Sequence, residues 1–226
     1  MKHIAVLTTL LLSASLQAVE KPYDYVFFEN SLMKGDYFYS QAKYTSPSWI
    51  KNARHHLPVA GSVAFTPGNS LELTYVSAPG GDWYSEIQYC PVRGNDFFRE
   101  PSTLSMQVRL RESMNAAALP NIAIRYADST YTQYLNLRNY LKDTRPGVWH
   151  PVSIPLEDFG LNAVNDTNIK KLAAVALRPG TADGNEYTIY LDDIELLPAS
   201  LPSVSALNAP VLQEAKAYDV SYTHLT

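Results

Sequence analysis

The chain is built of short runs in which every second side chain is apolar, and turn motifs separate these runs. In "TLSMQVRLR", residues 103–111, the apolar positions from Leu104 to Leu110 alternate with polar ones. Such a period of two is typical of a strand that buries one face. No stretch sustains a period of 3.6, and "RESMNAAALP", residues 111–120, has room for a single helical turn. The pattern therefore predicts an all-β fold.

Turn motifs such as "TPGN", "APGGD" and "RPGTADGN" divide the chain into about ten segments of this kind. The predicted strands are residues 25–29, 62–66, 70–77, 83–89, 103–111, 121–126, 132–138, 148–154, 172–177 and 187–196. A parallel sheet would need helical crossovers, which the sequence does not offer. We therefore expect an antiparallel β-sandwich or jelly roll. If residues 103–111 and 132–138 lie side by side, their polar faces would form a surface on which a polar oligomer could lie.

The two ends of the chain read differently from its middle. Residues 1–18, "MKHIAVLTTLLLSASLQA", have a short positive start, an apolar run too short to span a bilayer, and small residues before Ala18. This predicts a signal peptide and a secreted or periplasmic protein, with no cysteine at the cut for a lipid anchor; a buried N-terminal helix is the alternative. Residues 19–198 form the predicted jelly-roll domain. Residues 199–219 read as a linker and the start of a truncated fibronectin-III-like domain, and residues 220–226 as a non-native tail on a fragment of a longer protein.

Composition argues against a nucleic-acid partner and against stabilisation by an internal disulfide. The formal net charge is -4 and no basic run occurs, so nucleic acid is not an expected partner. Cys90 is the single cysteine, so it forms no internal disulfide and is expected to be a small buried residue. The domain must therefore be held together by its hydrophobic core.

Aromatic side chains near polar ones are candidates for sugar binding. Tyr39 and Trp49 lie in "GDYFYSQAKYTSPSW", between two predicted strands, and Trp83 stands beside Asp82 after a Gly-Gly turn. Tyr134 lies on the predicted strand 132–138. Exposed rings stack on the C–H faces of sugars while neighbouring polar groups bind hydroxyls. The alternative is that these rings cap the ends of the core.

The sequence assigns no catalytic residue. Asp82 with Glu86, or Asp96 with Glu100, could supply the two carboxylates of a glycoside hydrolase, but nothing distinguishes them from surface acids. No G-x-S-x-G motif occurs. His55 and His56 are adjacent, which is not a metal-binding spacing, and we expect them in a loop.

The stretch "EYTIYLDDIELLP", residues 186–198, alternates like a strand but carries two adjacent carboxylates, Asp192 and Asp193. If the alternation holds, one of them points inward. With "VWHPVSIPLEDFG" (148–160) and "YDYVFFEN" (23–30), it resembles the galactose-binding-like jelly rolls, the fold of many carbohydrate-binding modules. The resemblance implies a structural Ca²⁺ that ties the first strand to the last, with Glu29 and Asp192 as matching acids and Asp193 as the alternate. The alternatives are solvated edge acids, or one acid hydrogen-bonded to a neighbouring loop.

A longer stretch, beginning "YFYSQAKYTSPSWIKNARHHLPV", looks like the N-terminal module of secreted Bacteroidetes glycan-degrading proteins. In those proteins the module precedes a fibronectin-III-like domain and a glucoamylase-like helical catalytic domain. The resemblance implies a parent glycoside hydrolase acting on glucans, with its catalytic acids beyond this chain. We therefore expect a non-catalytic carbohydrate-binding or spacer module, with polysaccharide or oligosaccharide and the catalytic domain as partners. The alternatives are a stand-alone jelly-roll hydrolase or lyase, or a cell-surface interaction domain without a sugar ligand.

Overall fold

A computed structural model of the chain describes residues 25–89, 101–161 and 172–198. The predicted signal peptide, linker and tail lie outside the described residues, as do Cys90, Asp96 and Glu100. Within the described ranges, no helix is both long enough and apolar enough to cross a membrane.

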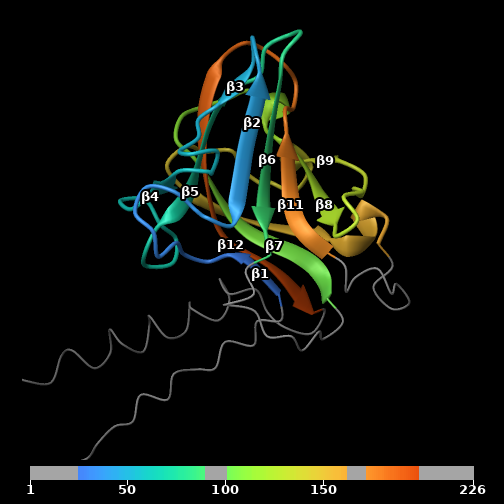
Figure 1. Ribbon diagram of the computed structural model, residues 1–226. Helices are drawn as coiled ribbons and strands as arrows, with labels where there is room; N and C mark the ends of the chain where they lie inside the picture. Colours follow the sequence, from blue (N-terminus) through green and yellow to red (C-terminus); the bar gives the residue numbers. More distant parts are fainter. Residues whose placement is uncertain (1–24, 90–100, 162–171, 199–226) are drawn as a thin grey trace, which may run out of the picture.

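Two antiparallel sheets face each other in two layers (Figure 1). The first sheet runs β10 (Trp149–Pro155), β7 (Pro101–Leu110), β12 (Glu186–Pro198), β5 (Ser70–Val76) and β3 (Trp49–Ile50), with β1 (Tyr25–Phe28) paired to β12 and β4 (Val59–Ala60) paired to β5. The second runs β2 (Ser40–Thr45), β6 (Asp82–Gln88), β11 (Leu172–Arg178), β8 (Asn121–Tyr126) and β9 (Leu135–Asn136). Short 3₁₀ turns are η1 (Ala116–Ala118), η2 (Leu137–Asn139) and η3 (Leu156–Phe159). The predicted antiparallel β-sandwich is confirmed.

The core lies between the sheets and follows the alternation seen in the sequence. The apolar positions of β7 from Leu104 to Leu110 are all buried, as are those of β12 from Tyr187 to Leu191. Trp83 of β6 and Tyr75 of β5 meet across the two layers, with ring centroids 4.8 Å apart. Burial of such large rings contributes strongly to stability, because the hydrophobic free energy grows with the apolar area removed from water.

The structure differs from the predicted strands in three segments. Residues 62–66 form a loop, and the aromatic segment predicted as a loop instead contains β2 and β3. Of residues 132–138, only Leu135–Asn136 pair as a strand, before η2 begins. The segments 103–111 and 132–138 belong to opposite sheets, so the polar surface expected from their pairing does not exist. Periodicity reports which face of a strand is buried, but not which strand lies beside it.

The paired aspartates sit at a β-bulge. The register of β12 against β7 shifts between Asp192 and Glu195, and Asp193 has a positive φ of 46°. A bulge adds one unpaired residue to a strand, and aspartate adopts this left-handed conformation more readily than most residues. Leu191 and Ile194, on either side, both belong to the core. The bulge therefore removes the expected conflict, because neither carboxylate has to point into the sandwich.

Candidate functional site

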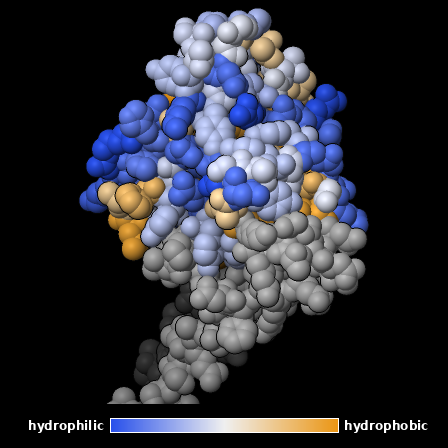
Figure 2. Space-filling view, turned by 45° about the vertical axis from the view of Figure 1, so that its right-hand side comes forward, coloured by the Kyte–Doolittle hydropathy of each residue, from blue (hydrophilic) through white to orange (hydrophobic). Residues whose placement is uncertain are grey.

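The outer face of the five-stranded sheet carries a connected group of tyrosines and charged side chains. On β6, Trp83 and Ile87 belong to the core, so the alternating residues Tyr84 and Glu86 point to the other side. We call the group the tyrosine face. It consists of Asp82, Tyr84, Glu86, Arg125, Tyr131, Tyr134 and Arg178. On the side of the molecule that bears β8, β9 and β11, hydrophilic and intermediate residues predominate, and hydrophobic ones form small separate patches (Figure 2).

Glu86 is the buried centre of the tyrosine face, with 1% of its surface exposed. Its Oε1 lies 2.6 Å from Nε of Arg125 and accepts a hydrogen bond of 3.1 Å from the Tyr131 hydroxyl. Its Oε2 accepts a hydrogen bond of 2.5 Å from Gln41 of the neighbouring edge strand β2. A buried charge needs such partners, because desolvation without them is costly. Glu86 therefore joins β2, β6 and β8 and fixes the orientation of Tyr131.

Three tyrosines surround this centre. The hydroxyls of Tyr84 and Tyr131 lie 3.2 Å apart, and the rings of Tyr131 and Tyr134 stack at 6.1 Å between centroids. Burial, followed by hydrogen bonding to Glu86, raises the pKa of Tyr84 well above its usual value, so the phenol stays neutral. Tyr131 and Tyr134 each expose 36% of their surface. The face therefore offers half-exposed rings together with polar tips.

Arg178, the last residue of β11, closes one end of the tyrosine face. Its guanidinium lies over the rings of Tyr84 and Tyr134, at 5.6 and 5.7 Å from their centroids. Its Nε donates a hydrogen bond of 3.1 Å to the Tyr134 hydroxyl, and Nη1 lies 3.5 Å from Asp82. Although burial lowers the pKa of Arg178, Tyr134 and Asp82 raise it overall, so the cation is retained.

The structure brings two of the five predicted sugar-binding residues, Asp82 and Tyr134, to this face. The prediction for Trp83 is wrong: the residue is 1% exposed, and its Nε1 donates a hydrogen bond to Ser77 inside the sandwich. The two others do not join the tyrosine face. Trp49 is half-buried on β3 of the other sheet, and Tyr39 packs partly against the core before β2 begins.

Sequence reasoning missed Tyr84, Glu86, Arg125, Tyr131 and Arg178 as members of one site. The segment "DWYSEI" did contain a signal for two of them. If apolar Trp83 and Ile87 face the core, strand alternation makes Tyr84 and Glu86 face outward. For Arg125, Tyr131 and Arg178 no local signal existed, since three other segments bring them to this sheet.

The structure does not favour catalysis by Asp82 and Glu86. Both carboxylate oxygens of Glu86 are engaged, by Arg125 and Tyr131 on one side and by Gln41 on the other. In a hydrolase such a carboxylate would have to reach the scissile bond. His55 and His56 lie in the loop between β3 and β4, as expected. In the described part of the chain, no set of three or more His, Cys, Asp or Glu residues is arranged to hold a metal ion.

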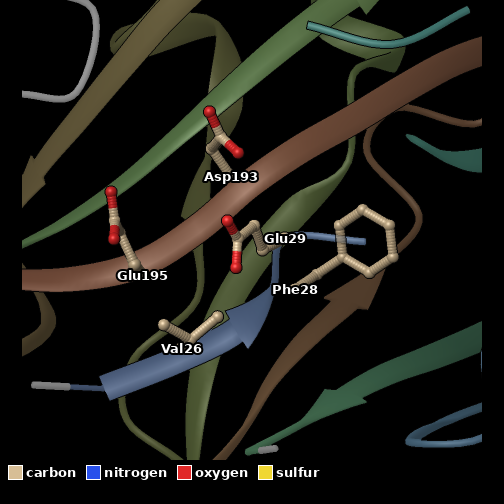
Figure 3. A pocket seen from close by; sticks show the side chains of 5 residues that line it. All are labelled: Val26, Phe28, Glu29, Asp193 and Glu195. Atoms are coloured by element: carbon tan, nitrogen blue, oxygen red, sulfur yellow. The ribbon is translucent and has the colours of Figure 1, made fainter. Parts of the chain in front are cut away.

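The predicted calcium ligands do not all line one hollow. Glu29, Asp193 and Glu195 line one small hollow with Val26 and Phe28, where β1 meets β12 (Figure 3). Carboxylate oxygens are suitable ligands for Ca²⁺, although these three acids are not arranged as a metal-binding group in the structure. Asp192 is not among the residues that line this hollow, so the expected pairing of Glu29 with Asp192 is corrected to Glu29 with the alternate, Asp193. Calcium itself stays a prediction.

Asp192 binds the loop of Phe65 and Thr66, one of the alternatives left open by the sequence, and Oδ2 of Asp193 accepts a hydrogen bond of 2.7 Å from the Thr66 hydroxyl of the same loop. Oδ2 of Asp192 accepts hydrogen bonds from the backbone N–H of Phe65 at 2.7 Å and of Thr66 at 3.3 Å. Its Oδ1 accepts one from the N–H of Asp193 at 2.9 Å. Burial, and then the charge of Asp193, raise the pKa of Asp192 to about 7 despite these donors.

The chain is a two-layer antiparallel β-sandwich with a polar outer face, and solved carbohydrate-binding modules have the same fold. The family 30 carbohydrate-binding module of a cellulosomal cellulase of Clostridium thermocellum matches with a TM-score of 0.57 at 17% identity, covering 78% of this chain and 98% of that one. Another crystal structure of a family 30 carbohydrate binding module gives a TM-score of 0.56 at 18% identity, over 84% of this chain and 97% of that one. These likenesses support the jelly-roll prediction. The chain belongs to the family Carbohydrate binding domain 30, whose sequence profile matches residues 24–197.

A longer protein shares almost the whole sequence. The chain is 99% identical over 219 residues to a protein of Parabacteroides distasonis named exo beta-1,2-glucooligosaccharide sophorohydrolase (non-reducing end). The match covers 97% of this chain but 30% of that protein, so the chain spans less than a third of this relative's length. The expected association of a carbohydrate-binding module with a glycoside hydrolase is confirmed.

Proposed function

We propose that this chain is a module that binds β-glucan oligosaccharides, with the tyrosine face as its binding surface. The observation that carries the proposal is the grouping of half-exposed Tyr131 and Tyr134 around the buried Glu86. Rings stack on the apolar faces of sugars, and the surrounding charged groups exchange hydrogen bonds with hydroxyls. Because the aromatic residues are held by a fixed network, little ordering is needed when a sugar binds.

The ligand class follows from membership of a carbohydrate-binding family and from the name of the matched hydrolase. That name specifies β-1,2-linked glucooligosaccharides, so we propose these as the first ligands to test. The surface is open and polar, so we expect dissociation constants in the range of about micromolar to millimolar. The role of the module would be to keep a downstream catalytic domain of the same chain near its substrate.

The direct test is calorimetric titration of the full chain with β-1,2-glucooligosaccharides. We expect saturable binding, and a loss of about tenfold or more in affinity when Tyr131 and Tyr134 are both replaced by alanine. Phe38→Ala is the matched control, because Phe38 is also exposed but packs against Tyr39 and His56. Thermal melting of each variant shows whether the fold is kept. Absence of binding to any glucan would leave the spacer role, and equal loss in the control would place the site elsewhere.

We also propose export of the module from the cell. The predicted signal peptide, residues 1–18, ends before the family match begins at residue 24. Cleavage after Ala18 would therefore leave the whole binding domain in the mature chain. Mass spectrometry of the protein recovered from its native host should give an N-terminus at Val19; an intact Met1 would refute the prediction.

A further inference from the structure

Arg178 and Asp82 form a donor and acceptor pair at the end of the tyrosine face. Both are partly open to solvent: their side chains expose 44% and 51% of their surface. Their closest approach, 3.5 Å from Nη1 to Oδ2, is long for a hydrogen bond. The two side chains are therefore close enough to bind one ligand together, and their contact with each other leaves hydrogen-bonding capacity for that ligand.

The neighbours of Arg178 fix the orientation of its guanidinium, while some of its N–H donors stay available. The guanidinium lies over the rings of Tyr84 and Tyr134, and the Tyr134 hydroxyl accepts a hydrogen bond from Nε. Among the described residues, no hydrogen bond or ion pair involves Nη2. Arginine has five N–H donors in a rigid plane, and stacking on aromatic rings fixes the direction in which they point. Asp82, with two acceptor oxygens, lies beside Nη1.

Such a pair matches two adjacent hydroxyls of a sugar ring. One hydroxyl oxygen would accept a hydrogen bond from Arg178, and the neighbouring hydroxyl would donate one to Asp82. Two hydroxyls on adjacent ring carbons stand side by side, so the two bonds can form together. A single isolated hydroxyl would use only half of the pair and leave one charged group poorly solvated.

We propose that Arg178 and Asp82 recognise a vicinal diol of a glucose unit and thereby select among glucan linkages. This inference rests on the proposed function. In a β-1,2-linked chain each internal unit keeps free hydroxyls on the adjacent carbons C3 and C4. In a β-1,3-linked chain the free ring hydroxyls, on C2 and C4, are separated by the linked C3. The pair therefore favours β-1,2-linked over β-1,3-linked chains, and Arg178 is a specificity-determining residue of the module.

The test compares calorimetric titrations of the full chain with long β-1,2- and β-1,3-glucans, in which chain ends are a small share of the units. We expect the wild-type chain to prefer the β-1,2-glucan by about tenfold. Arg178→Lys keeps the charge but loses the planar fork, and Asp82→Asn keeps the shape but loses the charged acceptor. Each should weaken β-1,2-glucan binding by about tenfold and β-1,3-glucan binding by less, so that the preference for the β-1,2-glucan narrows.

Arg145→Lys is the matched control, because Arg145 also pairs with an aspartate, Asp143, but lies in the loop before β10. Its binding should equal that of the wild-type chain. Wild-type affinity in both Arg178→Lys and Asp82→Asn, or equal binding of the two glucans by the wild-type chain, would overturn the inference while the proposed function stands. A wild-type chain that binds no glucan would instead overturn the proposed function, and the inference with it.

Discussion

Replacement of Asp192 by asparagine should make the module less sensitive to pH. Asp192 is fully buried, and burial raises the pKa of its carboxyl to about 7 in the folded chain, against 3.8 as the reference value. Between these two values the folded chain holds a proton that the unfolded chain has released. The free energy of unfolding therefore falls as pH rises through this window, and below and above it the contribution is constant.

The size of the effect follows from the width of the window. Each pH unit corresponds to about 1.4 kcal/mol, so a window of about three units gives a total of about 4 kcal/mol. Asparagine does not titrate, so the stability of Asp192→Asn relative to the wild-type chain should rise by about this amount from pH 4 to pH 8. A constant loss of about 1 kcal/mol is superimposed at every pH, because one amide group cannot accept all the bonds donated by Phe65, Thr66 and Asp193.

Urea unfolding followed by tryptophan fluorescence measures this difference at a series of pH values. A chelator in the buffer keeps the predicted cation away from the neighbouring Asp193. Glu157→Gln is the control, because it removes a carboxylate from an exposed position in η3 and should show no such trend. A stability difference that stays flat, or that falls as pH rises, would refute the raised pKa of Asp192.

Three further predictions concern the fold. If Glu29 and Asp193 bind Ca²⁺, a chelator should lower the melting temperature, and Asp193→Asn should abolish that response; an unchanged melt would leave both as ordinary acids. Trp83→Ala should destabilise the chain by about 3–5 kcal/mol in urea unfolding, with any loss of glucan binding explained by the unfolded fraction; a fully folded variant without affinity would contradict its placement in the core. Gly180→Ala should lower the melting temperature, because a Cβ at this position would lie 2.2 Å from the backbone oxygen of Leu119. In the control Gly147→Ala the added Cβ meets no atom within 4 Å, so this variant tests the effect of the positive φ alone. An unchanged melting temperature in Gly180→Ala would show that the backbone moves aside.

Asp82 and Tyr134 show how far the sequence reaches toward the site. Both are predicted from side-chain chemistry alone, and both lie on the tyrosine face. The same argument predicts a binding role for Trp83, which is wrong because a one-residue change of phase on β6 turns a side chain from the outer face to the core. The large apolar area of tryptophan, opposite Tyr75, makes the inward position the more stable one.

The sequence by itself determined the all-β class, the burial phase of the long strands and, through its resemblance to known jelly rolls, the expectation of a carbohydrate-binding module. These follow from local alternation and turn chemistry, which each segment carries within itself. Only the tertiary structure decided that Arg125, Tyr131 and Arg178 meet Tyr84 and Glu86, because strand order depends on how the whole core closes. It also places the adjacent aspartates of β12 at a bulge, where both carboxylates accept hydrogen bonds from the loop of Phe65 and Thr66 and Asp193 also lines the hollow beside Glu29. Pairing between strands far apart in the sequence creates both sites, and no single segment encodes that pairing.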